Sequence, residues 1–225
     1  YLRNDSGHPE ETDLTVTASV RNSAAVISGR SHVRLEQLDL RHSASYLLRV
    51  VNSADVGIRG CQLSEAGGLL DVNSSTNARI LGCNFDGAYG WPILALSGSA
   101  TTATLMFSVL HNAASNMAVY VSACQRLDIV NCSLIGARTR SIQNTSSGLV
   151  NIRNCLVTAT GSRESIGSDT ISSTAGTMLL GNSLVLPNGR NTALHLKGLV
   201  DLGGNVFGDP RFKQTRREGI WVIIE

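Results

Sequence analysis

The 225-residue chain carries 19 Lys and Arg against 17 Asp and Glu, a formal net charge of +2, and only 16% charged residues in all. This balance disfavours a general nucleic-acid binder, which needs a clustered basic face, so no nucleic-acid partner is expected. No stretch approaches the roughly 18 consecutive apolar residues of a membrane span, so none is expected. The hydrophobic fraction of 42% is sufficient for a packed core.

A short motif recurs along the chain. It consists of two apolar residues at alternate positions, then usually Cys or Ser, then another apolar residue two positions further on. The second copy, for example, consists of Val56, Ile58, Cys61 and Leu63. Copies start at Val33, Val56, Ala78, Ala103, Leu127, Val150, Met178 and Val200. The starts are about 22–28 residues apart, a period typical of solenoid repeats.

Most copies are followed by a second alternating run of apolar residues. Examples are Leu48 with Val50, Leu70 with Val72, Leu94 with Leu96, Val119 with Val121, and Leu194 with Leu196. Such period-two patterns indicate strands with one buried face. Segments rich in Ser, Asn and Gly, such as 73–75, 97–99 and 146–148, separate the runs and indicate turns.

No single unit can bury its apolar face alone, so the units must stack and share a core. We therefore predict an all-β fold, a right-handed parallel β-helix of about eight to nine rungs over residues 1–212. Residues 213–225 contain the apolar segment 219–225 and are expected to form a C-terminal cap strand or to begin a following domain.

A leucine-rich repeat is the alternative, because Leu35, Leu38 and Leu40 fit its opening spacing. The outer part of such a repeat is commonly a helix. Here that part is rich in Ser and Gly or alternates with period two, as in residues 118–121, which favours the β-helix.

Cysteines occupy the same place in four units, at Cys61, Cys83, Cys132 and Cys155, and Ser108 takes that place in another. Gly or Asn precedes the column, at Gly60, Gly82, Asn131, Asn154 and Asn182. These residue types tolerate a left-handed backbone and so predict a bend. Because no CxxC pair occurs and the chain has five cysteines, we expect buried free thiols, with a disulfide between the Cys61 and Cys83 rungs as the alternative.

Two segments near the start, 14–20 and 32–40, and the Asp-Pro-x-Phe phrase within 208–212 carry a resemblance to a known family. Over roughly residues 13–210 the chain resembles the secreted right-handed β-helix repeat proteins of the pectate-lyase-like superfamily. The resemblance implies the fold and a bacterial protein that is secreted or displayed at the cell surface. That superfamily includes lyases, hydrolases, adhesins, phage spikes and inert scaffolds. No catalytic motif of the family can be matched residue by residue to this sequence.

Candidate catalytic residues come from the bend after the first strand of each unit. The aligned pairs are residues 41–42, 64–65, 86–87 and 111–112, and rungs lie about 4.8 Å apart. This stacking predicts a cluster of His42, Glu65, Asp86 and His111. In a lyase, His111 or His42 would be the base. In a hydrolase, Glu65 and Asp86 would be the acid and its partner.

Candidate substrate-binding residues are aromatic side chains and arginines in neighbouring turns. Tyr46, Tyr89 and Trp91 lie beside the acids and offer apolar faces with a polar edge, which suit sugar rings. Arg138, Arg140 and Arg163 lie in turns of later units and could bind carboxylates or sulfates of an acidic polysaccharide. The structural alternatives are that His111 only bonds Asp86 across rungs, that Trp91 fills a gap, and that the arginines are solvated.

A second outward column is predicted to run through Arg49, Asp71, Ala95, Tyr120, Gln143 and His195. We interpret Arg49 and Asp71 as a cross-strand ion pair with a structural role.

These observations favour an extracellular β-helix that binds or cleaves a polysaccharide. The alternative is a non-catalytic scaffold, adhesin or spacer module, and a trimeric phage spike is a third hypothesis. No metal site and no cofactor is predicted, although calcium remains open, and the protein is expected to be a monomer.

Overall fold

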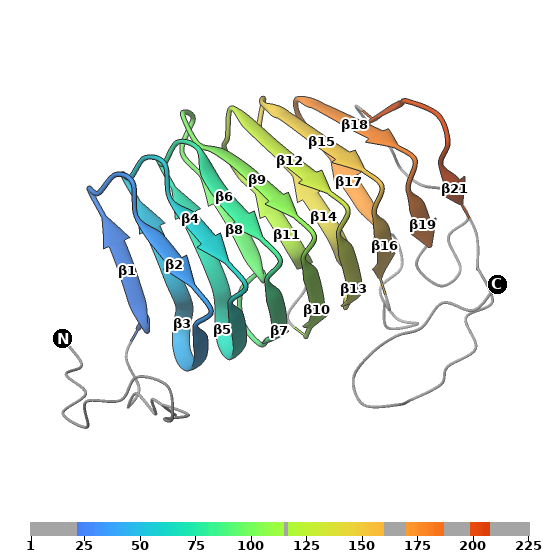
Figure 1. Cartoon of the computed structure of the whole chain (residues 1–225). Coiled ribbons are helices and arrows are strands. Elements are labelled where there is room, and N and C mark those ends of the chain that lie inside the picture. Colours follow the sequence, from blue (N-terminus) through green and yellow to red (C-terminus); the bar gives the residue numbers. More distant parts are fainter. Residues whose placement is uncertain (1–21, 115–116, 160–169, 187–198, 208–225) are drawn as a thin grey trace, which may run out of the picture.

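The computed structural model describes residues 22–114, 117–159, 170–186 and 199–207, and all regular structure within them is β-strand. Eight short parallel strands form one side of a coil, here called the first face (Figure 1). They are β2 (Arg34–Glu36), β4 (Gly57–Arg59), β6 (Ala78–Leu81), β9 (Thr102–Met106), β12 (Arg126–Val130), β15 (Leu149–Arg153), β18 (Thr177–Gly181) and β20 (Leu199–Asp201). The eight strands agree with the expected rungs and correspond to about seven turns of the coil.

The second sheet bends around a corner, because two of its strands are long. These are β3 (Asp39–Val51) and β5 (Gln62–Asn73). Their first halves belong to the second face, with β7 (Asn84–Ala88), β10 (Val109–Ala113), β13 (Ser133–Ala137), β16 (Leu156–Ala159), β19 (Leu184–Leu186) and β21 (Val206–Phe207). Their second halves belong to the third face, with β1 (Ala25–Ser28), β8 (Leu94–Ser97), β11 (Met117–Val121), β14 (Arg140–Asn144) and β17 (Ile171–Ser173). All pairings are parallel, so successive turns of the chain stack in register.

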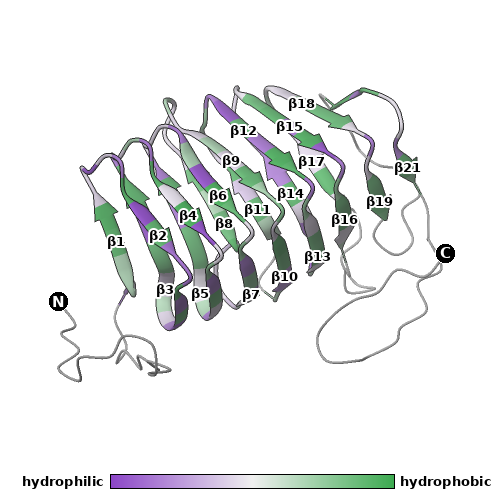
Figure 2. Ribbon diagram, viewed as in Figure 1, coloured by the Kyte–Doolittle hydropathy of each residue, from purple (hydrophilic) through white to green (hydrophobic). Residues whose placement is uncertain are grey.

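The interior of the coil consists of apolar ladders, one from each face. On the first face, Ile58 pairs with Ile80, and the ladder continues through Leu105, Ile129, Ile152 and Leu180. These side chains are buried, whereas their neighbours along the strand point outward. Figure 2 shows the result as hydrophilic segments on β2, β4, β6 and β12 next to hydrophobic ones. The period-two pattern therefore has the physical cause predicted from the sequence.

The corner between the first and second faces, here called the first corner, is a column of residues with left-handed backbone. Asn131, Asn154 and Asn182 have φ of 53°, 52° and 48°, and Gly60 and Gly82 have 59° and 61°. The predicted bend at these residues is confirmed. The same column contains Phe107 at φ 50°, a bulky residue for which this backbone is unfavourable.

All five cysteines are buried and free, as the sequence predicts. Burial raises the pKa of the Cys83 thiol to about 11, because a thiolate there would be poorly solvated. The pKa of Cys155 is raised by its hydrogen bond with Cys132 and by burial. The thiols of Cys83 and Cys155 are therefore weak nucleophiles, which supports a packing role for these two residues, whereas the hydrogen bond with Cys155 lowers the pKa of Cys132.

Residues 1–21 and 208–225 lie outside the described part of the chain. The proposed cap or following domain at 213–225, and the Asp-Pro-x-Phe phrase, therefore remain predictions from the sequence.

Candidate functional site

The corner between the second and third faces, here called the second corner, carries the predicted catalytic residues. The structure pairs Ser64 with Asp86 and Asp86 with His111, in the register expected from the sequence. His42 and Glu65 lie one residue later, in a column with left-handed backbone, at φ 59° and 57°. The four residues therefore occupy two adjacent outward columns of the same corner.

Each histidine at this corner contacts one carboxylate of the neighbouring rung. Nδ1 of His42 lies 3.2 Å from Oε2 of Glu65, and both side chains are about half exposed. Nδ1 of His111 lies 3.3 Å from Oδ1 of Asp86, in a less exposed position. The structure thus forms two separate imidazole–carboxylate pairs.

Two asparagines complete the surroundings of His111. The Asn112 amide donates to Oδ1 of Asp86 at 2.7 Å and lies 3.1 Å from Nδ1 of His111. Nε2 of His111 lies 3.2 Å from Oδ1 of Asn84, an acceptor. Nδ1 of His111 thus faces both the Asp86 carboxylate and the Asn112 amide, and Nε2 faces the amide oxygen of Asn84. Because both ring nitrogens are engaged, His111 could act as a base only after one of these bonds is broken.

The turn between β7 and β8 places two aromatic side chains at the surface. Its backbone is anchored on the previous rung, where the N–H of Tyr89 donates to the carbonyl of Ala66 and that of Trp91 to Gly67. Tyr89 is 61% exposed and Trp91 is 55% exposed. The phenol oxygen of Tyr89 lies close to Gly87, in the corner column of Glu65. The turn therefore links the second corner to the third face.

A hollow of about 550 Å³ lies on the outer side of the third face, over β3, β5, β8 and β11. Three aromatic side chains contribute to its wall, Tyr46, Trp91 and Tyr120. The complete lining is Ser45, Tyr46, Arg49, Asp71, Gly90, Trp91, Pro92, Ala95, Leu96, Ser97, Met117, Tyr120 and Ser122. Two of the predicted binding residues, Tyr46 and Trp91, thus meet in one site, whereas Tyr89 is not part of its lining.

The floor of the hollow is the outward column in which Arg49 aligns with Asp71, Ala95 and Tyr120. Nε of Arg49 donates to Oδ2 of Asp71 at 3.0 Å, and the Asp71 side chain is only 10% exposed. The expected ion pair is present, and the column continues to Gln143 as predicted. The sequence analysis did not predict that this column forms the floor of a hollow, because the sequence alone does not show which turn folds beside the column.

Tyr46, which was predicted to lie in a turn, belongs to β3 and lines this hollow. Burial and the negative charge of Asp71 raise the pKa of Tyr46 well above its ordinary value. Its hydroxyl therefore stays protonated and can donate a hydrogen bond at neutral pH. The ring lies directly on Gly68, where a Cβ atom would come within 2.5 Å of the Tyr46 ring.

Of the three arginines predicted to bind substrate, the structure describes two, Arg138 and Arg140. Arg138 is exposed in the turn after β13. Arg140 was predicted to lie in a turn, but it begins β14 and pairs with Met117. Because Met117 lines the hollow, Arg140 lies one rung beyond the hollow. Within the described residues its Nε atom is buried and has no hydrogen-bond partner. Arg163, like His195 of the outward column, lies outside the described residues.

Two further features are absent from the part of the chain that the structure describes. No set of three or more His, Cys, Asp and Glu side chains there is arranged to hold a metal ion. Nor does that part include a helix with the length and hydropathy to cross a membrane.

Parallel strands that coil around one shared interior define a β-solenoid, a class of repeat protein. The family model described as "right handed beta helix region" matches residues 4–184, and the chain belongs to this family. No curated protein matches it. Among solved structures it is similar to QnrB1, a plasmid-mediated fluoroquinolone resistance protein, at 11% identity over 83% of this chain and 92% of that one. The TM-score of 0.22 is too low for that likeness to bear on function.

Proposed function

We propose that this β-helix binds a polysaccharide in the hollow of the third face. The observation that carries the proposal is the gathering of Tyr46, Trp91 and Tyr120 around the Arg49–Asp71 ion pair. Ligand sites in proteins commonly combine apolar and aromatic walls with a few polar groups, in hollows of about 300–1,000 Å³. This hollow has that size and that composition.

The chemistry of the lining suits a sugar. Aromatic faces provide flat apolar surface for the CH side of a pyranose ring. The protonated Tyr46 hydroxyl can donate to a ring substituent, and the ion pair offers both a donor and an acceptor to hydroxyl groups. Arg140, one rung away, would favour a chain that carries carboxylate or sulfate groups.

Binding is favoured over cleavage by the contacts of the second corner. Neither His42 nor His111 is among the residues that line the hollow, and both nitrogens of His111 are engaged. A lyase needs a base that faces the substrate. We therefore propose non-catalytic binding as the main activity, by a monomer of the pectate-lyase-like superfamily that is secreted or displayed at a bacterial surface.

The test is affinity electrophoresis of the whole chain in gels that contain uronate-rich or neutral polysaccharides, with and without calcium. Retardation that is lost in Trp91→Ala, but kept in Phe107→Ala, would support the proposal. Phe107 is the matched control, because it is an aromatic residue of similar exposure, 60%, at a different corner. Absence of retardation in every gel would favour the scaffold alternative. Unsaturated products or new reducing ends in the same incubations would show cleavage and contradict a purely binding role.

A further inference from the structure

An apolar patch interrupts the charged outer surface of the first face. Leu81, Met106 and Val130 pair in register on β6, β9 and β12, and all three point outward and are partly exposed. Phe107 and Val109, at the adjoining first corner, are 60% and 37% exposed. These five residues are here called the first-corner patch.

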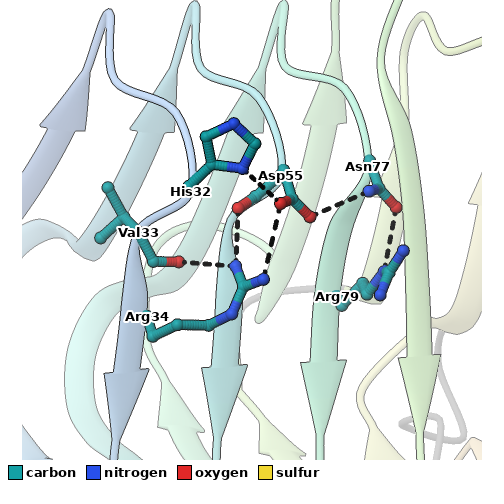
Figure 3. A network of polar contacts seen from close by, with 6 residues as sticks. All are labelled: His32, Val33, Arg34, Asp55, Asn77 and Arg79. Atoms are coloured by element: carbon teal, nitrogen blue, oxygen red, sulfur yellow. Dashed lines mark hydrogen bonds and ion pairs between the residues drawn. The ribbon is translucent and has the colours of Figure 1, made fainter.

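Arginines border the patch on several sides. Along the same outward column, Arg59 precedes Leu81 and Arg153 follows Val130. Arg79 lies two residues before Leu81 on β6 and is oriented by the side-chain oxygen of Asn77, at 3.0 Å. Figure 3 shows Asn77 joined in turn to Asp55, which also holds Arg34 and His32. The border therefore carries three arginines, of which Arg79 is fixed by Asn77. It also includes Asp128, which shares the column of Arg79 and is paired with Arg126 at 2.7 Å.

The backbone conformation at Phe107 indicates that its side chain has a role in binding rather than in stabilising the fold. Other described rungs have Gly, Asn or Gln at this place of the first corner. A left-handed backbone is costly for a bulky residue, and Phe107 is mostly exposed, so its ring gains little burial in return. Residues kept in unfavourable conformations are common at binding sites. Aromatic residues and arginines are also the side chains enriched at the centres of protein interfaces.

We infer that the first-corner patch is a docking site for an amphipathic helix of another protein, with carboxylates flanking its apolar stripe. The rungs repeat at about 4.8 Å, close to the 5.4 Å pitch of an α-helix, so a helix along the coil axis can place one side chain per rung. Arg59 and Arg153 are four rungs apart, or about 19 Å, which corresponds to about 13 helical residues between the two acids.

The charges disfavour a second copy of this chain as the occupant. A two-fold axis through Met106 would bring Arg59 of one copy next to Arg153 of the other, because the two lie at equal distances from it along the column. Like charges placed opposite one another oppose association. The patch lies at the first corner and the hollow on the third face, so this inference does not depend on the proposed function.

The test is selection from a phage-displayed library of helical peptides that share an apolar stripe and have random flanking positions. The whole chain is the target, and Phe107→Asn is the counter-target, since Asn occupies this corner in three other rungs. We expect enriched peptides with Asp or Glu at both ends of the stripe, about 13 residues apart, opposite Arg59 and Arg153. Their binding should weaken about tenfold or more in Phe107→Asn and in the double variant Arg59→Glu, Arg153→Glu.

Three results would overturn the inference. One is that peptides are enriched no more strongly on the whole chain than on Phe107→Asn. Another is that the selected peptides share basic or neutral residues next to the apolar stripe. The third is a concentration-dependent dimer, seen by sedimentation, that Phe107→Asn abolishes. If Phe107→Asn does not fold, Val109→Ser tests the same patch from β10, with circular dichroism as the check on folding.

Discussion

Replacing Trp91 with Ala should weaken polysaccharide binding by an amount that follows from its exposure. A tryptophan side chain offers up to about 250 Å². With 55% of Trp91 exposed, roughly 140 Å² is open to a ligand, and one face of a sugar ring would cover about half of it. At about 25 cal/mol per Å², those 70 Å² correspond to about 1.7 kcal/mol, or an increase in Kd of about 15- to 20-fold.

The same substitution has a bounded effect on stability. The remaining buried surface of Trp91 is about 110 Å², so its loss should cost at most about 3 kcal/mol of unfolding free energy. Trp91→Phe keeps part of that packing and should fall between the wild type and Trp91→Ala in Kd.

The assay for both variants is isothermal titration with the polysaccharide that gives the strongest retardation, alongside urea unfolding of each variant. An unchanged Kd in a folded Trp91→Ala protein would refute the assignment of the hollow as the binding site. Equal losses in Trp91→Ala and Phe107→Ala would refute it too, because Phe107 lies outside the hollow.

Three other predictions concern the coil itself. Gly82 has φ 61° and open space around it, so Gly82→Asn should leave the unfolding free energy nearly unchanged, whereas Gly82→Ala should lower it by about 1–2 kcal/mol in urea unfolding. Equal losses in the two variants would contradict the role assigned to the left-handed backbone. At Gly148 an added Cβ would lie 1.9 Å from the carbonyl oxygen of Cys124, so Gly148→Ala should separate the two rungs and lower the melting temperature more than Gly82→Ala does. The pKa of Cys83 is higher in the folded state than in the unfolded chain, so the folded protein holds the thiol proton more tightly. The free energy of unfolding should therefore fall as pH rises from about 9 towards 11. In Cys83→Ser that slope should be shallower, which urea unfolding at pH 7, 9 and 10.5 would measure; an identical slope would show that another group is responsible.

The local pattern of the sequence was sufficient to predict the coil. Alternating apolar residues such as Ile58 and Ile80 specify which side of each strand is buried, because the side-chain period of a strand is two. Asn131 and Asn154 mark the first corner, because few residue types adopt a left-handed backbone without cost. With the repeat period known, the register of Asp86 with His111 could also be predicted, since equivalent residues of successive units stack.

What the sequence left open depends on groups that turns bring together. Tyr46, Trp91 and Tyr120 belong to three different rungs, and only the folded turn at residues 87–92 places Trp91 beside the column of Tyr120. The contact of His111 with Asp86 was foreseen from the register. Its contacts with Asn84 and Asn112 were hidden, because a side chain's hydrogen bonds depend on rotamers and neighbouring rungs rather than on spacing along the chain. The sequence by itself therefore determined the stacked coil and its buried side, through the period of its strands. The tertiary structure decided which outward side chains share a site, since that depends on the paths of the turns.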